Sequence, residues 1–353
     1  MSSIINAKSP MPERIALVGA GLIGQRHLDA IARCGKAELV AIVDPRPSVA
    51  ETAARRGVPY FTGVTAMLDA LAPSGVIVAT PTDSHCEPSL EALHRKCHLL
   101  VEKPLAATSD EARTIASVAR GLGLHILVGH HRRYYPQVER AREMVRGGVL
   151  GKPVAVSGQW CVRKHESYYD IDWHRRWQGG PVMTNLVHEI DCLRYILGPV
   201  RSVQAESGSQ LRGLEKEDAV AVIMCFEGGV LGSFVLSDQA DSPWAWEFAT
   251  GENPSYPRSG QNCMRFMGTE AALDFPNLRL WTSDSMPGTW HSPKRPQDMP
   301  MESGDAFVRQ IGHFADVIAG RARPRITADD ATWSLEVTLA VLEAARSGTR
   351  VKL

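Results

Sequence analysis

The feature that most constrains the fold is a regular alternation of short apolar runs and amphipathic segments from Arg14 to Val128. The apolar runs are rich in Val, Ile and Leu and lack the polar alternation of a half-exposed sheet. They indicate strands buried on both faces, as in a doubly wound α/β domain whose parallel sheet is covered by helices. The predicted strands are 14–18, 38–43, 75–79, 98–102 and 125–129, and the predicted helices are 23–34, 48–56, 65–72, 84–95 and 109–123.

The rhythm of the sequence changes after Pro136. A helix at 137–146 is followed by β-rich segments, with one further helical stretch at 185–197. Their alternation is typical of a large, mostly antiparallel open β-sheet, and the Gly228-Gly229 step suits a tight hairpin. The predicted strands are 154–163, 202–209, 219–228, 229–238, 264–268 and 272–275. A long loop at 242–261 and two helices at 305–319 and 328–346 complete this part.

Two domains are expected, because 353 residues exceed a typical single core of about 100–200 residues. Residues 1–135 are predicted to form the α/β domain. Residues 136–353 are predicted to form an α+β domain that binds substrate and mediates association. Since an open sheet offers a broad face to a second copy, we expect a homodimer or homotetramer.

The composition excludes several classes of protein. The chain has 39 Lys and Arg against 39 Asp and Glu, so it lacks the broad basic field that nucleic acids or anionic membranes require. Residues 1–14 contain no apolar secretion signal, and no apolar run is long enough to span a membrane. The seven cysteines form no CxxC motif and indicate a reducing compartment. We expect a soluble, cytoplasmic protein with a small-molecule substrate and no nucleic-acid or membrane partner.

A glycine-rich turn follows the first predicted strand and opens a helix. Gly19, Gly21 and Gly24 form a GxGxxG pattern, in which Leu22 and Ile23 lie between the second and third glycines. Glycines at this place let the backbone turn sharply and approach a pyrophosphate, which then lies at the positive end of the helix. Because the motif stands between a predicted strand and a predicted helix, it indicates a Rossmann dinucleotide-binding domain.

Two charged residues after the second strand bear on the choice of cofactor. Asp44 lies where a carboxylate accepts hydrogen bonds from the adenosine ribose, which favours NAD over NADP. Arg46 weakens that preference, because a guanidinium can pair with the 2'-phosphate of NADP. The sequence therefore predicts NAD, with NADP as the alternative; a solvated cation is the alternative role for Arg46.

Candidate ligand-contacting residues also follow two later predicted strands. Thr80, Pro81 and His85 come after the third predicted strand, and Glu102 and Lys103 end the fourth. Carboxyl ends of strands line the ligand crevice in such sheets. A lysine there is placed for acid or base chemistry once its surroundings lower its pKa from about 10.4. The alternative is a surface lysine ahead of a helix.

These motifs resemble the glucose-fructose oxidoreductase, inositol dehydrogenase and rhizopine-catabolism family, written Gfo/Idh/MocA. The resemblance rests on the glycine turn, on Thr80-Pro81 with His85, and above all on Glu102-Lys103-Pro104. It continues through residues 128–136 and 179–191, in the family's order and spacing, and so covers nearly the whole chain.

The resemblance implies an NAD(P)-dependent oxidoreductase acting on a secondary alcohol or its ketone. It implies that Lys103 is the catalytic lysine and that His188 contacts substrate and relays the proton. It also places Glu102 and His131 near the nicotinamide. His131 stands where the family has an amide, which leaves that contact open.

One position departs from the family pattern. Many members carry an aspartate four residues before the histidine, where this chain has Thr184. Neither Thr184 nor the neighbouring Asn185 is a base, so proton transfer is expected to depend more on Lys103 and His188. Asn185 is a candidate to orient His188 or a substrate hydroxyl, while Asp191 either orients the imidazole or makes a core contact.

The stretch from 163 to 180 is dense in Tyr, Trp, His and Arg. Aromatic faces and hydrogen-bonding groups suit a substrate pocket for a hydroxyl-rich ring. The candidate substrate contacts are Tyr168, His174 and either Arg175 or Arg176, and the two adjacent arginines leave room for a carboxylated substrate. The alternative is a surface loop that makes subunit contacts.

Three functions remain open from the sequence. The leading hypothesis is a dehydrogenase or reductase of a sugar, cyclitol or related polyhydroxylated compound. A second keeps hydride transfer but has a dihydrodiol or carboxylated cyclic diol as substrate. A third is a sensor that binds NAD(H) without turnover. The twelve histidines show no metal-binding motif, so no metal is expected.

Overall fold

The computed structural model describes residues 11–208, 211–253, 255–285 and 287–353. Outside these ranges lie residues 1–10, which are part of the stretch 1–14 where no secretion signal is expected, and residue 209, the last of the predicted strand 202–209. Two compact units are present. The first combines the chain up to Tyr134 with Asp305–Thr332, and the second combines Tyr135–Gly304 with Trp333–Leu353. The chain passes from the first unit to the second after Tyr134, one residue before the expected boundary at 135/136. Residues 305–332 were expected in the second domain, but they belong to the first unit.

The first unit is built on a six-stranded parallel sheet in the order β3-β2-β1-β4-β5-β6. The strands are β1 (Glu13–Val18), β2 (Ala37–Val43), β3 (Tyr60–Phe61), β4 (Gly75–Val78), β5 (His98–Val101) and β6 (Ile126–Val128). Their central side chains are fully buried, as expected for strands covered on both faces. The five predicted strands are confirmed, and only the two-residue β3 was missed.

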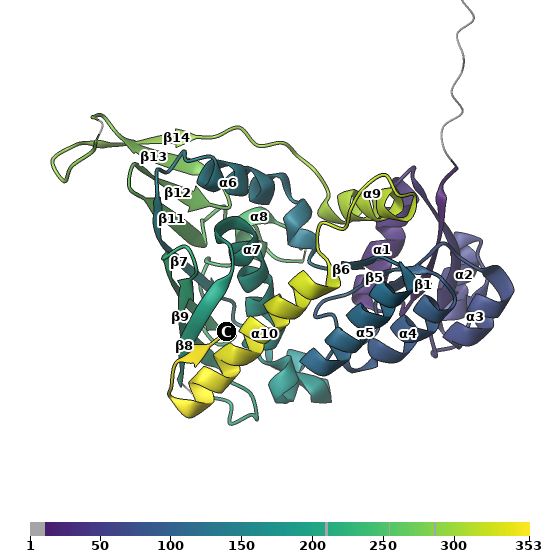
Figure 1. Cartoon of the computed structure of the whole chain (residues 1–353). Helices are drawn as coiled ribbons and strands as arrows, with labels where there is room; N and C mark the ends of the chain where they lie inside the picture. The colour runs from purple at the N-terminus through teal and green to yellow at the C-terminus, as the bar shows by residue number, and fades with distance from the viewer. Residues whose placement is uncertain (1–10, 209–210, 254, 286) are drawn as a thin grey trace, which may run out of the picture. The chain divides into compact units, whose positions relative to one another are not determined.

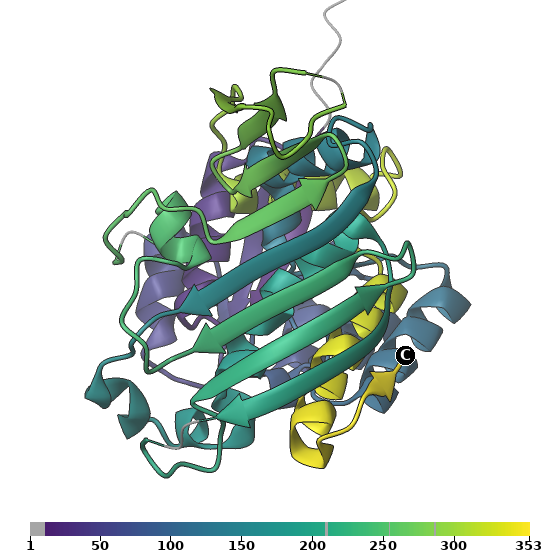
Figure 2. The same ribbon diagram turned by 90° about the vertical axis from the view of Figure 1, so that its left-hand side faces the viewer.

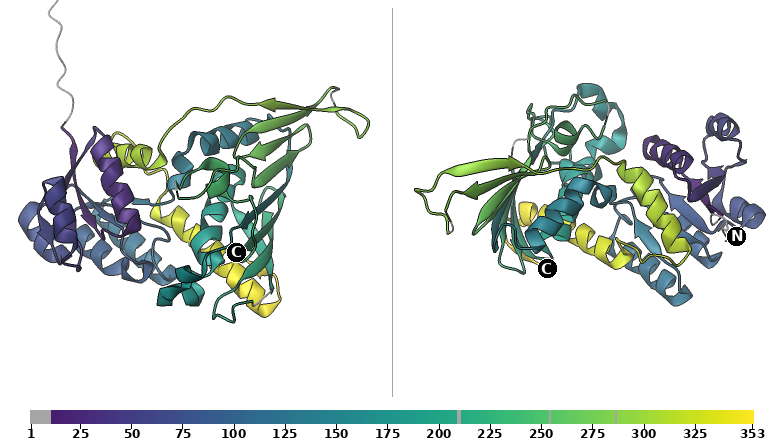
Figure 3. Two further views of the ribbon diagram at one scale, coloured as in Figure 1. Left: turned by 180° about the vertical axis from the view of Figure 1, so that it is seen from behind. Right: turned by 90° about the horizontal axis from the view of Figure 1, so that it is seen from above.

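Helices cover both faces of this sheet. They are α1 (Leu22–Arg33), α2 (Val49–Arg56), α3 (Val64–Leu71), α4 (Cys86–His94), α5 (Ser109–Leu122) and α9 (Ala306–Ile318), with short 3-10 turns η1 (Thr82–Ser84) and η2 (His131–Tyr134). Figures 1 and 3 show α1 and α9 on one face and α3, α4 and α5 on the other.

Helix α9 explains why residues 305–332 return to the first unit. Its start is capped by Asp305, whose carboxylate accepts hydrogen bonds from the backbone of Phe307 and Val308. Its buried face packs against α1 and on β4, where a Cβ at Gly75 would lie 2.6 Å from the Ile318 side chain. Burial of this amphipathic face therefore ties a late segment of the chain to the first sheet.

The second unit is built on a nine-stranded mixed sheet in the order β14-β13-β12-β11-β7-β10-β9-β8-β15. Most neighbours are antiparallel, but β10 pairs with β7 in parallel. The strands are β7 (Pro153–Cys161), β8 (Val200–Gly208), β9 (Ala219–Phe226), β10 (Leu231–Ser237), β11 (Met264–Gly268), β12 (Ala271–Phe275), β13 (Arg279–Ser283), β14 (Lys294–Asp298) and β15 (Val351–Lys352). Strands β13, β14 and β15 were not predicted, because they are short or strongly charged.

One face of this sheet carries the core of the second unit. Its helices are α6 (Pro136–Arg146), α7 (Val187–Leu197), α8 (Trp246–Thr250) and α10 (Ala328–Ser347), with 3-10 turns η3 (Glu166–Asp170), η4 (Asp172–Arg175) and η5 (Trp177–Gly179) and a π-helical turn η6 (Val182–Leu186). Apolar side chains of α6, α7 and α10 pack on the sheet. Figure 2 shows the opposite face, which no helix crosses. Helix α8 lies within the predicted long loop.

Two further features concern the described residues. No helix among them combines the length and hydrophobicity that crossing a membrane requires. All seven cysteines lie within the described ranges, and none of them forms a disulfide.

A buried charge cluster lies beside the start of β9 in the second unit. The Lys216 ammonium is 2.6 Å from the Asp238 carboxylate and 3.6 Å from that of Asp218, and all three side chains are buried. Tyr169 also donates a hydrogen bond to Asp238. The lysine therefore offsets negative charge that burial would otherwise make costly.

Replacing Lys216 by Met is expected to lower the free energy of unfolding by about 3–5 kcal/mol, because two buried carboxylates lose their counter-ion. Denaturant titration followed by circular dichroism measures the change. The control is Lys152→Met on the surface of the same unit, for which about 0–0.5 kcal/mol is expected. Equal effects of the two substitutions would contradict the assigned role.

Candidate active site

The glycine turn has the geometry of a phosphate cradle. Gly19 has φ +90°, and a Cβ there would lie 2.6 Å from the carbonyl oxygen of Ala79; a Cβ at Gly24 would collide with the carbonyl of Gly19. A Cβ at Gly21 would meet no other described atom within 4 Å, and Gly21 begins α1 without a side-chain cap. The start of α1 is thus open to an anion. Leu22 and Ile23 are exposed beside it.

Asp44 connects the end of β2 to this turn. Its buried carboxylate accepts a hydrogen bond from the Ala20 backbone at 2.9 Å. The Arg46 guanidinium donates two hydrogen bonds, of 2.7 and 2.8 Å, to the same carboxylate, although the Arg46 side chain is 57% exposed. Burial alone would raise the pKa of Asp44, but the bonds from Arg46 and Ala20 outweigh it and lower the pKa. Asp44 is therefore ionised at neutral pH.

The His85 ring contacts the segments that follow two neighbouring strands, β4 and β5. One ring nitrogen lies 3.0 Å from the Thr80 carbonyl oxygen and the other 3.0 Å from that of Pro104. Burial lowers the pKa of His85, against the opposing influence of these carbonyls and of Glu102. The ring thus lies between the segment with Pro81 and the segment that carries Lys103, and in its neutral form it donates a hydrogen bond to one of these two carbonyl oxygens.

Glu102 and Lys103 follow β5 directly. The Glu102 carboxylate is buried and lies 2.7 Å from Nε2 of His27 on α1. Its other oxygen accepts a hydrogen bond from the Lys103 backbone at 3.2 Å. Lys103 is half-buried, and its peptide bond to Pro104 is cis. The structure thus brings together the cofactor candidates at the carboxyl ends of β1, β2, β4 and β5.

His131 lies in η2, after β6. Its ring stacks on Phe307 of α9 with centroids 4.5 Å apart. Sequence reasoning missed both His27 and Phe307. A polar residue on the buried face of a predicted amphipathic helix was the available signal for His27, whereas nothing local connected Phe307 with His131.

In the second unit, the predicted substrate residues lie on the π-helical turn η6 and on α7. The Thr184 hydroxyl donates to the Gly180 carbonyl, and its oxygen lies 2.8 Å from the Asn185 amide oxygen. His188 follows on the first turn of α7 and is 9% exposed. π-Helical turns occur frequently at functional sites, and this one was not predicted.

Two carboxylates lie in this region, one on α7 and one before β9. Asp191 is fully buried and accepts a hydrogen bond from Ser334 of α10, so it makes the core contact that was one of its two predicted roles. Glu217 was missed: it accepts a hydrogen bond from the Val182 backbone at 2.8 Å, beside Gly180, which has no side chain to exclude it. Burial raises the pKa of Glu217.

The loop candidates pack mainly within their own segment. The rings of Tyr168 and His174 stack with centroids 3.8 Å apart, and the Lys164 ammonium lies 4.0 Å above Tyr168. His174 is buried, and burial lowers its pKa. Arg175 donates to the Tyr169 carbonyl, and Arg176 pairs with Asp172. Substrate contact by Tyr168, His174 and Arg175 stays a prediction.

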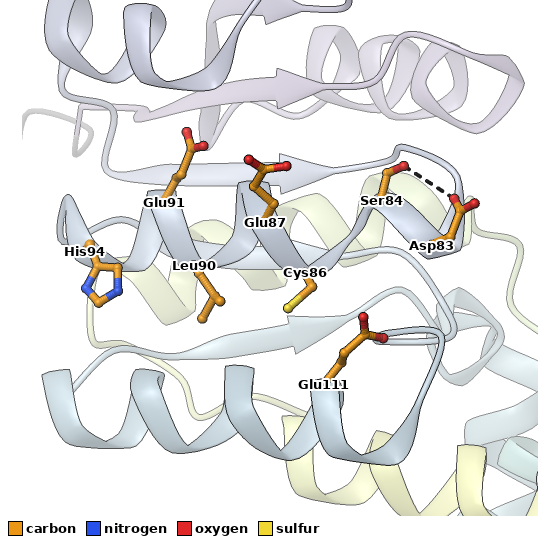
Figure 4. A pocket seen from close by; sticks show the side chains of 8 residues that line it. All are labelled: Asp83, Ser84, Cys86, Glu87, Leu90, Glu91, His94 and Glu111. Carbon is orange, nitrogen blue, oxygen red and sulfur yellow. Dashed lines mark hydrogen bonds between the residues drawn. The ribbon is translucent and has the colours of Figure 1, made fainter.

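A separate hollow of about 600 Å³ lies on the first unit, between α4 and the start of α5. Its lining includes Cys86 and the carboxylates of Asp83, Glu87, Glu91 and Glu111 (Figure 4). Their charge opposes binding of a pyrophosphate. Burial raises the pKa of Cys86, with help from Glu111 and Glu87, so the thiolate is disfavoured. Among the described residues, those of this hollow included, no group of three or more His, Cys, Asp or Glu is arranged to hold a metal ion.

Two family models match the chain. Residues 13–130 match the model described as "Oxidoreductase family, NAD-binding Rossmann fold", and residues 142–353 match the model described as "Oxidoreductase family, C-terminal alpha/beta domain". The glycine cradle and the ionised Asp44 fit this cofactor, because they offer an uncapped helix start to the pyrophosphate and a carboxylate to the ribose. NAD is therefore the cofactor of the first unit.

Several curated relatives have names that refer to sugars or cyclitols. The rhizopine catabolism protein MocA of Rhizobium meliloti is 31% identical over 244 residues, which are 67% of this chain and 76% of MocA. The scyllo-inositol 2-dehydrogenase (NAD(+)) of Bacillus subtilis is 25% identical over 353 residues, with 96% of each chain covered.

Solved structures share the fold. The WlbA dehydrogenase of Bordetella pertussis, in complex with NADH and UDP-GlcNAcA, has a TM-score of 0.78 at 23% identity, with 97% of this chain and 99% of that chain covered. An Agrobacterium radiobacter oxidoreductase, in complex with NAD+, L-tartaric acid and magnesium, has a TM-score of 0.81 at 15% identity, with 96% of this chain and 98% of that chain covered.

Removing Arg46 is expected to sharpen the preference for NAD. Its exposed guanidinium is the cation that would pair with a 2'-phosphate, so Arg46→Ala should weaken NADP binding by about tenfold and NAD binding far less. Titration of both cofactors into the purified protein measures the ratio. Arg55→Ala, which removes an exposed arginine of the same unit, is the control; equal losses for the two cofactors in Arg46→Ala would show that Arg46 does not read the phosphate.

Proposed function

The chain belongs to the Gfo/Idh/MocA oxidoreductase family, and from this premise we propose that it transfers a hydride between NAD and a secondary alcohol or ketone of a sugar, cyclitol or related polyhydroxylated compound. In this proposal the first unit binds the cofactor, and the second unit binds the substrate and associates with a second copy. The relatives named as rhizopine, inositol and glucoside enzymes support this substrate class.

The observation that carries the proposal is the placing of Lys103. It follows the buried strand β5 at the edge of the sheet where the glycine turn and Asp44 also lie. Its backbone N–H donates a hydrogen bond to the Glu102 carboxylate, and a ring nitrogen of His85 lies 3.0 Å from the carbonyl oxygen of the next residue, Pro104. This position supports the proposed role of Lys103, which is to act on the reacting hydroxyl.

When bound, the nicotinamide supplies the hydride acceptor or donor. The chain supplies the proton chemistry. In oxidation the neutral amine of Lys103 takes the hydroxyl proton, and the ammonium so formed stabilises negative charge on the reacting oxygen; in reduction the ammonium returns the proton. His188 contacts the reacting oxygen and relays the proton, since an imidazole exchanges protons near neutral pH. Thr184 and Asn185 contribute hydrogen bonds to substrate hydroxyls.

The dihydrodiol or carboxylated-diol alternative rested on the paired arginines and on Thr184 in place of the aspartate. The guanidinium groups of Arg175 and Arg176 bond to Tyr169 and Asp172 within the loop, which weakens the first ground, whereas the second ground stands. The sensor alternative does not need Lys103 or His188, because binding without turnover requires no proton relay. Both alternatives remain outcomes of a substrate panel.

Replacing Lys103 by Met is expected to lower turnover by roughly a hundredfold to ten-thousandfold, because the acid–base group is lost, while NAD binding persists. Absorbance at 340 nm with inositols, aldoses, sugar acids and cyclic diols measures turnover, and titration measures NAD binding. Lys36→Met, at an exposed ion pair of the same unit, should leave both unchanged.

Turnover that survives in Lys103→Met would remove Lys103 from the mechanism. NAD binding without turnover by the unmodified protein on any compound of the panel would favour the sensor.

We further propose a homo-oligomer that forms through the uncovered face of the nine-stranded sheet. Ile223, Leu231 and Val235 lie on this face and are 49%, 57% and 48% exposed. Their neighbours across β9 and β10 are Ala221 and Ser233, so uncharged side chains occupy this part of the face, which supports its role as a contact surface for a second copy. The seven cysteines, none of which is in a disulfide, support the proposal of a reducing, cytoplasmic location.

Val235→Glu is expected to dissociate this oligomer, because paired copies would bury the new charges without partners. Light scattering coupled to gel filtration measures the mass. Val154→Glu replaces an equally exposed valine near the start of β7 whose side chain alternates onto the other face, and it serves as the control. An oligomer that persists in Val235→Glu, or a monomer in the unmodified protein, would contradict the proposal.

A further inference from the structure

The Glu102 carboxylate is held from inside the first unit by a histidine. His27 lies on the buried face of α1, 75 positions earlier in the chain, with none of its surface exposed. Its Nε2 is 2.7 Å from Glu102 Oε1. Since its Nδ1 has no hydrogen-bond partner among the described residues, Nε2 is the nitrogen that carries a hydrogen toward the carboxylate.

The second carboxylate oxygen is also fixed. It accepts the Lys103 backbone N–H at 3.2 Å, on the side where the chain leaves β5. Gly129, at the end of β6, has no side chain, and a Cβ there would lie 2.8 Å from this oxygen. The carboxylate therefore occupies one position, between α1, β6 and the backbone of the catalytic lysine.

The charge state of Glu102 depends on its basic neighbours. Burial alone would raise the pKa of Glu102, but the hydrogen bond and charge of His27, together with His131 and Lys103, outweigh burial and lower it. His85, across the strand ends, is also close enough for Glu102 to influence its pKa. Glu102 is thus faced by titratable groups from α1, from η2, from the residue that precedes α4 and from the loop after β5.

We propose that His27 is a positioning residue, which holds the Glu102 carboxylate beside the Lys103 backbone so that a fixed negative charge stands at the nicotinamide site. This inference rests on the proposed function, which places the nicotinamide at the carboxyl ends of the strands. The oxidised ring is cationic and the reduced ring is neutral. A fixed carboxylate therefore stabilises bound NAD+ relative to NADH, and His27 controls that preference through Glu102.

The experiment compares His27→Leu with His27→Gln. Leucine fills the site but donates nothing, whereas the glutamine amide nitrogen can take the place of Nε2. In His27→Leu we expect NAD+ binding at pH 7 to weaken by about tenfold and NADH binding to change little, because the buried carboxyl group becomes protonated. His27→Gln should restore the ratio. Equilibrium titration of each cofactor form measures it, with the exposed His125→Leu as the matched control.

A second readout does not use the cofactor. In the unmodified protein the pKa of Glu102 is lowered, so its stabilising contribution is present above the unfolded value of about 4.3 and is lost as the pH falls below it. In His27→Leu burial dominates and raises this pKa. The loss in the free energy of unfolding should therefore grow as the pH rises from 4 to 7, and it should disappear in the Glu102→Gln background.

The outcomes separate this inference from the proposed function. Equal weakening of NAD+ and NADH in His27→Leu, or no rescue by His27→Gln, would overturn the positioning role. If His27→Leu does not fold, Glu102→Gln alone must reproduce the shift in the NAD+ to NADH ratio, and an unchanged ratio would overturn the role. Absence of NAD binding by the unmodified protein would refute the proposed function, while the pH dependence of unfolding would still test the His27–Glu102 pair.

Discussion

The burial of parallel strands on both faces is the constraint on which the rest of the first unit depends. It leaves the strand ends as the places where polar groups can be presented. The glycine turn after β1, Asp44 after β2, Thr80 after β4 and Lys103 after β5 consequently share one edge of the sheet. No single segment contains this site; the parallel order of the strands assembles it.

Buried charges in both units are matched with partners that decide their chemistry. His27 and Arg46 outweigh the cost of burying Glu102 and Asp44, and both carboxylates stay ionised. Glu217 receives only weaker support, so burial raises its pKa. The balance between burial and hydrogen bonding therefore lowers the pKa of the carboxyl groups Asp44 and Glu102 in the first unit, and it raises the pKa of Glu217, which lies near the helix that carries His188.

Periodicity allowed most elements to be predicted, because long apolar runs and amphipathic helices depend on local patterns. The two-residue β3 and the charged β14 carry no such pattern. The return of 305–332 to the first unit depends on an apolar face that fits α1 and Gly75, which no local rule reveals. In the site, Gly19, Asp44 and Lys103 were predicted from motif and position, whereas His27, Phe307 and Glu217 were missed.

The sequence by itself determined the doubly wound domain, the dinucleotide cradle and the family, because each depends on residues that are close together in the chain or occur in a fixed order. Only the tertiary structure decided which groups touch the predicted ones. His27 meets Glu102 across 75 positions, and Glu217 meets the backbone of Val182 across 35. Such contacts arise from the packing of helix on sheet, and they set charge and position through burial and hydrogen bonding.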